Sequence, residues 1–186
     1  TLTIGDSSLA GPSISGGMIS GGSAGVSGST PAAQTGGTFG PDLFIRSGGT
    51  VTFTHSGILV LSQPIASNQY VGGQAIAGQG GLIMNGSGTL TLGGSNTYTA
   101  STTIQSGTLS VSYNSNLGDT TLNGVGNNVI IGNGTLQTTA SFSSPRLFSL
   151  TGGATIDTTG TNLTLTGVIS GSGSLTKQGT GTLSLL

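Results

Sequence analysis

Apolar and polar residues alternate within short segments through most of this chain. Leu90 and Leu92 alternate with threonines, and the same pattern recurs at residues 108–111 and 162–165. Successive residues of a β-strand point to opposite faces, so the aliphatic side chains share one face and Thr and Ser share the other. The pattern predicts short strands with an aliphatic inner face and a polar outer face.

The strand-like segments recur about every eight residues, with Gly, Ser and Asn between them as turn signals. They centre near positions 91, 104, 110, 121, 130, 136, 148, 155, 164, 169, 176 and 184. If three strands form one turn of a solenoid, each rung takes roughly 25 residues. The residues predicted to point inward are Leu90, Leu92, Leu109, Val111, Leu122, Ile156, Leu163, Leu165, Leu175, Leu183 and Leu185.

A long internal repeat supports this stacked, all-β architecture. Residues 76–92 and 169–185 carry the same order of aliphatic residues and glycines. A repeat of this kind, poor in charge and rich in Gly, Ser and Thr, is typical of a solenoid with a structural role. On the rung length above, the repeat corresponds to about four rungs.

The chain divides into two regions by composition. Residues 45–186 are predicted to form a single domain of parallel β-helix rungs. Residues 1–44 begin with a plausible strand at Thr1–Ile4 and continue into the Gly/Ser-rich stretch 11–41, which three prolines interrupt. This stretch is either a flexible loop or lateral insertion, or a Gly-packed contact surface for another copy of the protein.

Charge and cysteine content exclude several classes of function. Only 4% of the 186 residues are charged, against roughly 25% in ordinary proteins, and the net charge is −1. The chain has no basic patch, so nucleic-acid binding is not expected. It has no cysteine, and no apolar run approaches the length of a membrane-spanning helix.

Residues 86–111 resemble a known repeat family, the autotransporter-associated β-strand repeat, also called the passenger-associated transport repeat. The matching positions are Gly88, Thr89, Leu90, Leu92, Gly94, Asn96, Tyr98, Thr102, Ile104, Gly107, Leu109 and Val111. Ala100 departs from the pattern, which usually has Gly there. In the second copy Lys177 matches the usual Lys of the motif, whereas Met84 occupies that position in the first copy.

The resemblance implies a right-handed parallel β-helix in the passenger of a bacterial autotransporter or a related surface protein. It implies export across the outer membrane to the cell surface, and no catalytic residues in this segment. The second copy stops within the motif at Leu186, so we expect the native protein to continue, with a translocator barrel outside this fragment.

The residues that could carry chemistry are few and isolated. His55 has inward parity, whereas its neighbour Ser56 has outward parity, which predicts a structural histidine rather than a catalytic base. A glycosidase needs two neighbouring carboxylates, but Asp6, Asp42, Asp119 and Asp157 are scattered along the chain. We therefore expect no enzyme activity, no catalytic residues, no metal and no cofactor. Asn96 is predicted to cap a corner or join an asparagine ladder, with a glycan contact as the alternative.

The predicted function is a structural or adhesive cell-surface module, a rigid solenoid segment that mediates adhesion or self-association. Its expected partners are other copies of itself or surface glycans, because a charge-poor surface does not repel its own kind. One alternative is the passenger fragment of a secreted toxin or effector. A second is an ice- or polysaccharide-binding array of outward threonines such as Thr89 and Thr91, although their spacing along the chain is uneven.

Overall fold

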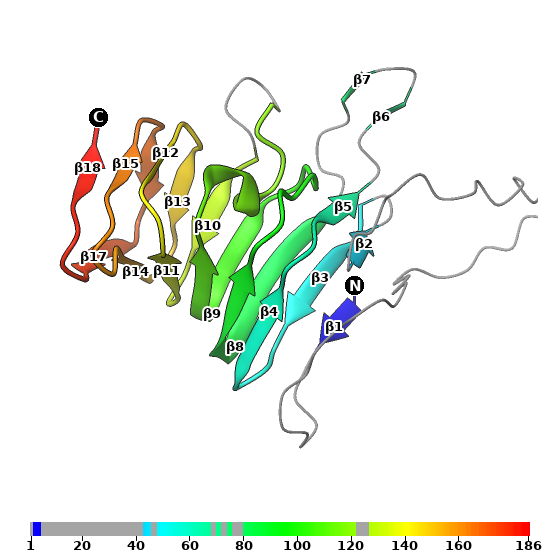
Figure 1. Ribbon diagram of the computed structural model, residues 1–186, viewed down its shortest axis with the longest axis horizontal. Helices are drawn as coiled ribbons and strands as arrows, with labels where there is room; N and C mark the ends of the chain where they lie inside the picture. The colour runs from blue at the N-terminus through cyan, green and yellow to red at the C-terminus, as the bar shows by residue number, and fades with distance from the viewer. Residues whose placement is uncertain are drawn as a thin grey trace, which may run out of the picture.

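The structure, a computed structural model, describes residues 2–4, 43–45, 48–67, 70–71, 74–75, 80–121 and 127–186. These residues form short β-strands, and the pairing between successive strands is parallel. The exception among them is the antiparallel pair β6 (Tyr70–Val71) and β7 (Gln74–Ala75). Figure 1 shows the strands lying side by side along the long axis, with β1 at one end and β18 at the other. The fold is therefore all-β, with parallel strands in a curled sheet.

The chain passes repeatedly over three faces, which we number 1 to 3. Face 1 is a ladder of parallel strands in the order β1, β3, β8, β9, β10, β13 and β16. Their bounds are Leu2–Ile4, Thr50–Phe53, Gly81–Leu92, Thr102–Val111, Val129–Ile131, Phe148–Leu150 and Ile169–Gly171. The predicted strand at the start of the chain is thus confirmed, because β1 pairs in register with β3.

Face 2 is formed by β4, the second halves of β8 and β9, and then β11, β14 and β17. The bounds of the new strands are Ile58–Leu61, Thr135–Thr138, Gly153–Asp157 and Ser174–Gln178. The strands β8 and β9 run across both faces and join them into one sheet. Their mutual register is irregular between Met84 and Thr89, where the first face ends and the second begins.

Face 3 contains two separate short ladders. One consists of β2 (Leu43–Ile45) and β5 (Ile65–Ser67), and the other of β12 (Phe142–Ser144), β15 (Leu163–Leu165) and β18 (Leu183–Leu185). Between them lie residues 94–101 and the 3₁₀ helix η1 (Asn114–Leu117). Backbone bonds continue the stacking there, because Thr97 donates to the carbonyl of Ile65 and Asn96 to that of Ser115.

The rungs differ in length, and some are shorter and some longer than the sequence predicted. We define a rung as the stretch from one residue to the residue stacked on it in the next turn of the chain. Hydrogen-bonded residues in successive rungs are 20 residues apart at Asn96 and Asn116, and again at Thr158 and Gln178. Other rungs are longer, because Ala100 and Asn127 are 27 residues apart and Ile65 and Asn96 are 31 residues apart.

The pairing on face 1 gives the same picture of the rungs. From Leu82 the positions in line are Thr102, Val129, Phe148 and Ile169. The step from Thr102 to Val129 is the longest of these four, and the other three are similar to one another. The rung from Thr102 to Val129, called the long rung below, therefore contains additional residues between its strands. The other three rungs of this series have shorter corners.

The two copies of the long repeat occupy different faces. Leu82 lies on face 1, but its equivalent Leu175 lies on face 2, paired with Ala154. Leu90 lies on face 2, whereas its equivalent Leu183 lies on face 3, paired with Leu163. Ile169 is the residue stacked in line with Leu82 four rungs later, and Leu175 comes after Ile169 in the chain. The repeat is therefore longer than four rungs by about one short strand. The same local sequence therefore folds into the next face along the rung.

The aliphatic core runs along the inside of these faces. Seven of the residues predicted to point inward are at most 1% exposed, namely Leu90, Leu92, Leu109, Val111, Ile156, Leu163 and Leu165. Leu122 lies outside the described residues. Leu175 and Leu183 are partly buried against the core, and Leu185 is 52% exposed. Leu185 is in register with the buried Leu165, so its exposure reflects pairing on one side only.

Not every predicted strand is present, and one region cannot be compared. Thr121, at a predicted strand centre, is not in a strand. The Gly/Ser-rich stretch 11–41 lies outside the described residues, and the division of the chain at residue 44 stays a prediction. In the structure, the parallel pairing of β2 with β5 starts at Leu43, just before the predicted start of the β-helix region at residue 45.

Candidate functional site

The described residues contain little of the chemistry that an active site requires. No group of three or more His, Cys, Asp or Glu side chains in this part of the chain could hold a metal ion. Asp157 accepts hydrogen bonds from Gln137 and Thr159, which help to lower its pKa, while Asp119 accepts bonds from Thr121. The two carboxylates thus have different local partners. The absence of catalytic residues and cofactors stays a prediction.

His55 has the structural position that its parity predicted. Its side chain is 1% exposed, and its Nδ1 lies 3.1 Å from the carbonyl of Gly57. Its Nε2 is buried without a hydrogen-bond partner, whereas the adjacent Ser56 is exposed. The imidazole therefore fills the corner between β3 and β4, with Ser56 on the opposite side of the chain.

The asparagines of the predicted ladder lie one above the other in successive rungs at the corner of face 3. The Oδ1 of Asn96 accepts the backbone N–H of Ile65 at 2.7 Å, and its Nδ2 donates to the carbonyl of Asn116. Asn116 in turn donates to the carbonyl of Gly94 at 2.8 Å. Both side chains are at most 3% exposed. They supply backbone partners where no strand ladder exists, which confirms the structural interpretation of Asn96.

A second buried polar group lies beside this ladder. The Tyr98 hydroxyl is 2.7 Å from the Thr102 hydroxyl, and Thr102 donates to the carbonyl of Leu117 at 2.8 Å. The Nδ2 of Asn127 donates to the carbonyl of Ala100 at 2.7 Å. Burial raises the pKa of Tyr98 to about 12, so this phenol is neutral at physiological pH. Tyr98 and Thr102 thus join the 3₁₀ helix to the start of β9.

Arg146 completes this polar cluster, and its side chain is fully buried. Its Nε donates to the Asn114 side chain at 2.8 Å, and its Nη2 donates to the carbonyls of Asn114 and Gly118 at 2.9 and 2.8 Å. Its Nη1 donates to the carbonyls of Asp119 and Asn127, both at 3.0 Å, and to the Asn127 side chain. Burial lowers the pKa of Arg146 to about 10, which still leaves the guanidinium charged at neutral pH.

Arg146 is the residue of this cluster that sequence reasoning missed. Arginine is almost never fully buried without partners, and the pattern around residue 146 contains no motif that marks it as internal. Its acceptors at Asn127 and Asn114 lie 19 and 32 residues earlier in the chain. The available signal was weak: an arginine that follows a proline, in a chain with three Lys and Arg residues altogether.

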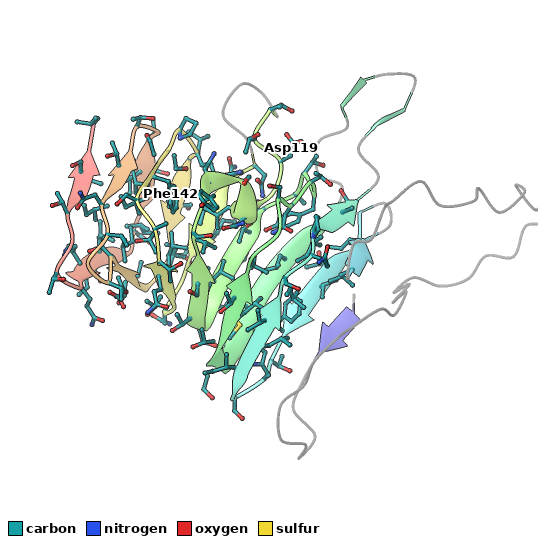
Figure 2. All side chains as sticks on the ribbon, viewed as in Figure 1. Asp119 and Phe142 are labelled. Carbon is teal, nitrogen blue, oxygen red and sulfur yellow. The ribbon has the colours of Figure 1, made fainter. Side chains whose placement is uncertain are left out.

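Five outward threonines form one column on face 2. Register places Thr89 beside Thr108, then Thr135, Thr155 and Thr176. These residues are unevenly spaced along the chain, yet the pairing aligns them at the ladder spacing of about 4.8 Å. The unevenness in the sequence was therefore no obstacle to a regular array. Figure 2 shows side chains along the whole stack, with Asp119 near its upper rim and Phe142 among the strands.

The prediction that Thr and Ser face outward is wrong at several positions. Thr102, Thr138, Ser144 and Thr158 are buried at inward positions. Each is bonded internally: Thr138 to the Thr161 hydroxyl at 2.8 Å, for example, and Ser144 to the Asn114 side chain at 2.8 Å. A buried hydroxyl is tolerated where it has a partner. Ser110, which faces outward, is also buried at 3% exposure.

Comparison with known proteins finds a family match for part of the chain. Residues 82–111 match the family described as passenger-associated-transport-repeat. The resemblance seen in the sequence is confirmed. An adhesin autotransporter of Brucella suis biovar 1 (strain 1330), BmaC, is 40% identical over 89 residues. These residues are 47% of this chain and 2% of that adhesin, and no solved structure matches the chain.

The polar and glycine positions of the passenger-associated-transport-repeat have structural roles here. Its Asn96, Tyr98 and Thr102 belong to the buried hydrogen-bond network described above. Its glycines lie where backbones approach closely: a Cβ at Gly88 would be 2.1 Å from the carbonyl oxygen of Gly57. Gly107 has a φ of +69°, which favours glycine.

None of the helices in the part of the chain that the structure describes has the length and hydrophobicity of a membrane span.

Proposed function

We propose that this chain is a segment of a right-handed parallel β-helix in an autotransporter passenger, with a structural and adhesive role at the bacterial cell surface. The main support is the parallel stacking of short rungs over three faces, in the size range of solenoid repeats. Connections between parallel strands are almost always right-handed, which gives the expected hand. Continuous pairing along the axis makes such a stack stiff, as a stalk or fibre segment requires.

The location at the cell surface is supported by the comparisons. Residues 82–111 match a passenger-associated-transport-repeat, and the similar Brucella protein is described as an adhesin. We infer export across the outer membrane and adhesion rather than catalysis. The matched part of this chain covers 2% of that adhesin, so we do not assign the adhesin's partners and activity to this chain.

The surface of face 2 is the best candidate for contact with another copy. Its threonine column presents hydroxyl groups, which both donate and accept hydrogen bonds, so two identical columns are complementary to each other. The expected partner is therefore a second copy of this chain.

Sedimentation velocity over a wide micromolar range tests this proposal. We expect association that increases with concentration and depends little on salt, since few charges are involved. Thr135→Lys, at the centre of the column, should weaken lateral association, while Ser149→Lys on face 1 should not. A monomer at every concentration would contradict self-association.

The threonine column also supports a second candidate function, binding of a neutral polysaccharide. Hydroxyl side chains at regular spacing offer repeated hydrogen bonds to a repeating chain of sugars. Retention on insoluble polysaccharide, lost in Thr135→Lys and kept in Ser149→Lys, would support this candidate. Retention that is equal in both variants would exclude the column as the binding surface.

A further inference from the structure

The rung from Thr102 to Val129 is longer than its neighbours. Within it, Ala100 and Asn127 are hydrogen-bonded across 27 residues, whereas Asn127 and Arg146 in the next rung are bonded across 19 residues. Leu117 lies within the stack, where its carbonyl accepts the Thr102 hydroxyl, and Asn127 lies within the stack, where it donates to the carbonyl of Ala100. The additional residues therefore lie between these points.

Both ends of this additional stretch meet at one side chain. The backbone N–H of Asn127 donates to the carbonyl of Asp119 at 3.3 Å. The Nη1 of Arg146 donates to the carbonyls of both residues, each at 3.0 Å. A single nitrogen thus connects Asp119 with Asn127, two residues that are separated in the chain. The other nitrogens of Arg146 bind Asn114 and Gly118 and so fix the 3₁₀ helix.

The six acceptors of these bonds are backbone carbonyls and asparagine amide oxygens. The nearby Asp119 carboxylate favours the charged guanidinium, and these neutral oxygens are the acceptors that fix its orientation. An arginine suits this arrangement because its planar head presents five N–H donors in a fixed fork. The carbonyls at a corner without a strand ladder gain partners that the ladder does not supply.

We propose that Arg146 is a positioning residue that closes the long rung. It holds the two ends of the additional stretch together and anchors η1, so that β9 and β10 pair in register despite the extra residues between them. Arg146 belongs to the following rung, just before β13, and the contact forms only when that rung has stacked. It therefore couples two successive rungs into one cooperative unit.

Hydrogen exchange followed by mass spectrometry tests this role on the full chain. In Arg146→Met, we expect amides of residues 113–121 and 127–131 to exchange faster by about tenfold or more, because hydrogen bonds to a charged group are lost. Exchange in β4 and in the first half of β8, far along the stack, should change by less than about threefold. Uniform acceleration over all rungs, or none near residues 113–131, would overturn the proposal.

Two further variants separate the fork geometry from general stability. Arg146→Lys keeps the charge but has one nitrogen, so it should restore only part of the protection; full restoration would overturn the role of the fork.

If Arg146→Met does not fold, Asn114→Ala is the milder test, because it removes the side-chain acceptor of Nε. Its matched control is Asn133→Ala, whose exposed side chain accepts the N–H of Gly153. Asn114→Ala should accelerate exchange at residues 113–121, and Asn133→Ala should not; equal effects would contradict the proposal.

Discussion

Leu109 provides the sharpest test of the stacked core, because its neighbour Thr108 points the opposite way in the same strand. Leu109 is fully buried and is paired in register with Leu90 before it and Leu136 after it. Truncating a buried leucine to alanine costs about 2–5 kcal/mol, depending on how far the surroundings close over the cavity. Here backbone ladders hold the strands on both sides at fixed spacing. We therefore expect Leu109→Ala to lower the free energy of unfolding by about 3–5 kcal/mol.

Urea unfolding with linear extrapolation measures this loss, and Thr108→Ala is the matched control. Thr108 is on the outer surface of face 2, so its truncation should cost less than about 1 kcal/mol. Leu109→Asp should cost more than Leu109→Ala, because it also buries a carboxyl group without a partner. Equal losses for Leu109→Ala and Thr108→Ala would refute the assignment of inner and outer positions in β9.

Three further predictions concern the passenger-associated-transport-repeat. Gly88→Ala should lower the melting temperature strongly, because the added Cβ would be 2.1 Å from the carbonyl oxygen of Gly57. Gly57→Ala is the control and should not lower it, because a Cβ there has nothing within 4 Å. Similar melting temperatures for the two variants would contradict the close backbone contact at Gly88. Asn96→Ala should cost about 1–3 kcal/mol in urea unfolding, because the N–H of Ile65 loses its buried acceptor; a loss below this range would mean that another group replaces it. Tyr98 has its pKa raised to about 12, so its contribution to stability is complete below pH 10 and is lost as pH rises toward 12. The stability advantage of the native protein over Tyr98→Phe should therefore shrink by about 2–3 kcal/mol over that interval; an unchanged difference would refute the raised pKa.

Strand parity and the buried asparagine were accessible from the sequence for a local reason. Alternation of Leu109 with Thr108 depends only on the two-residue period of an extended chain. The role of Asn96 follows from its place in a corner motif, where the backbone needs side-chain partners. Rung length was not accessible, because it depends on how many residues each corner takes up. The sequence-based value assumed uniform corners, whereas stacked residues are separated by 19, 20, 27 or 31 residues in different rungs.

The sequence by itself determined the class of fold, the inward residues of most strands and the resemblance to a passenger repeat, since these depend on local period and motif spacing. Only the tertiary structure decided which strands are neighbours. That choice aligned five unevenly spaced threonines into one column and placed the two copies of the repeat on different faces. It also buried Arg146 among six oxygens from the preceding rung. Such contacts arise from register between distant segments, which no local pattern in the chain records.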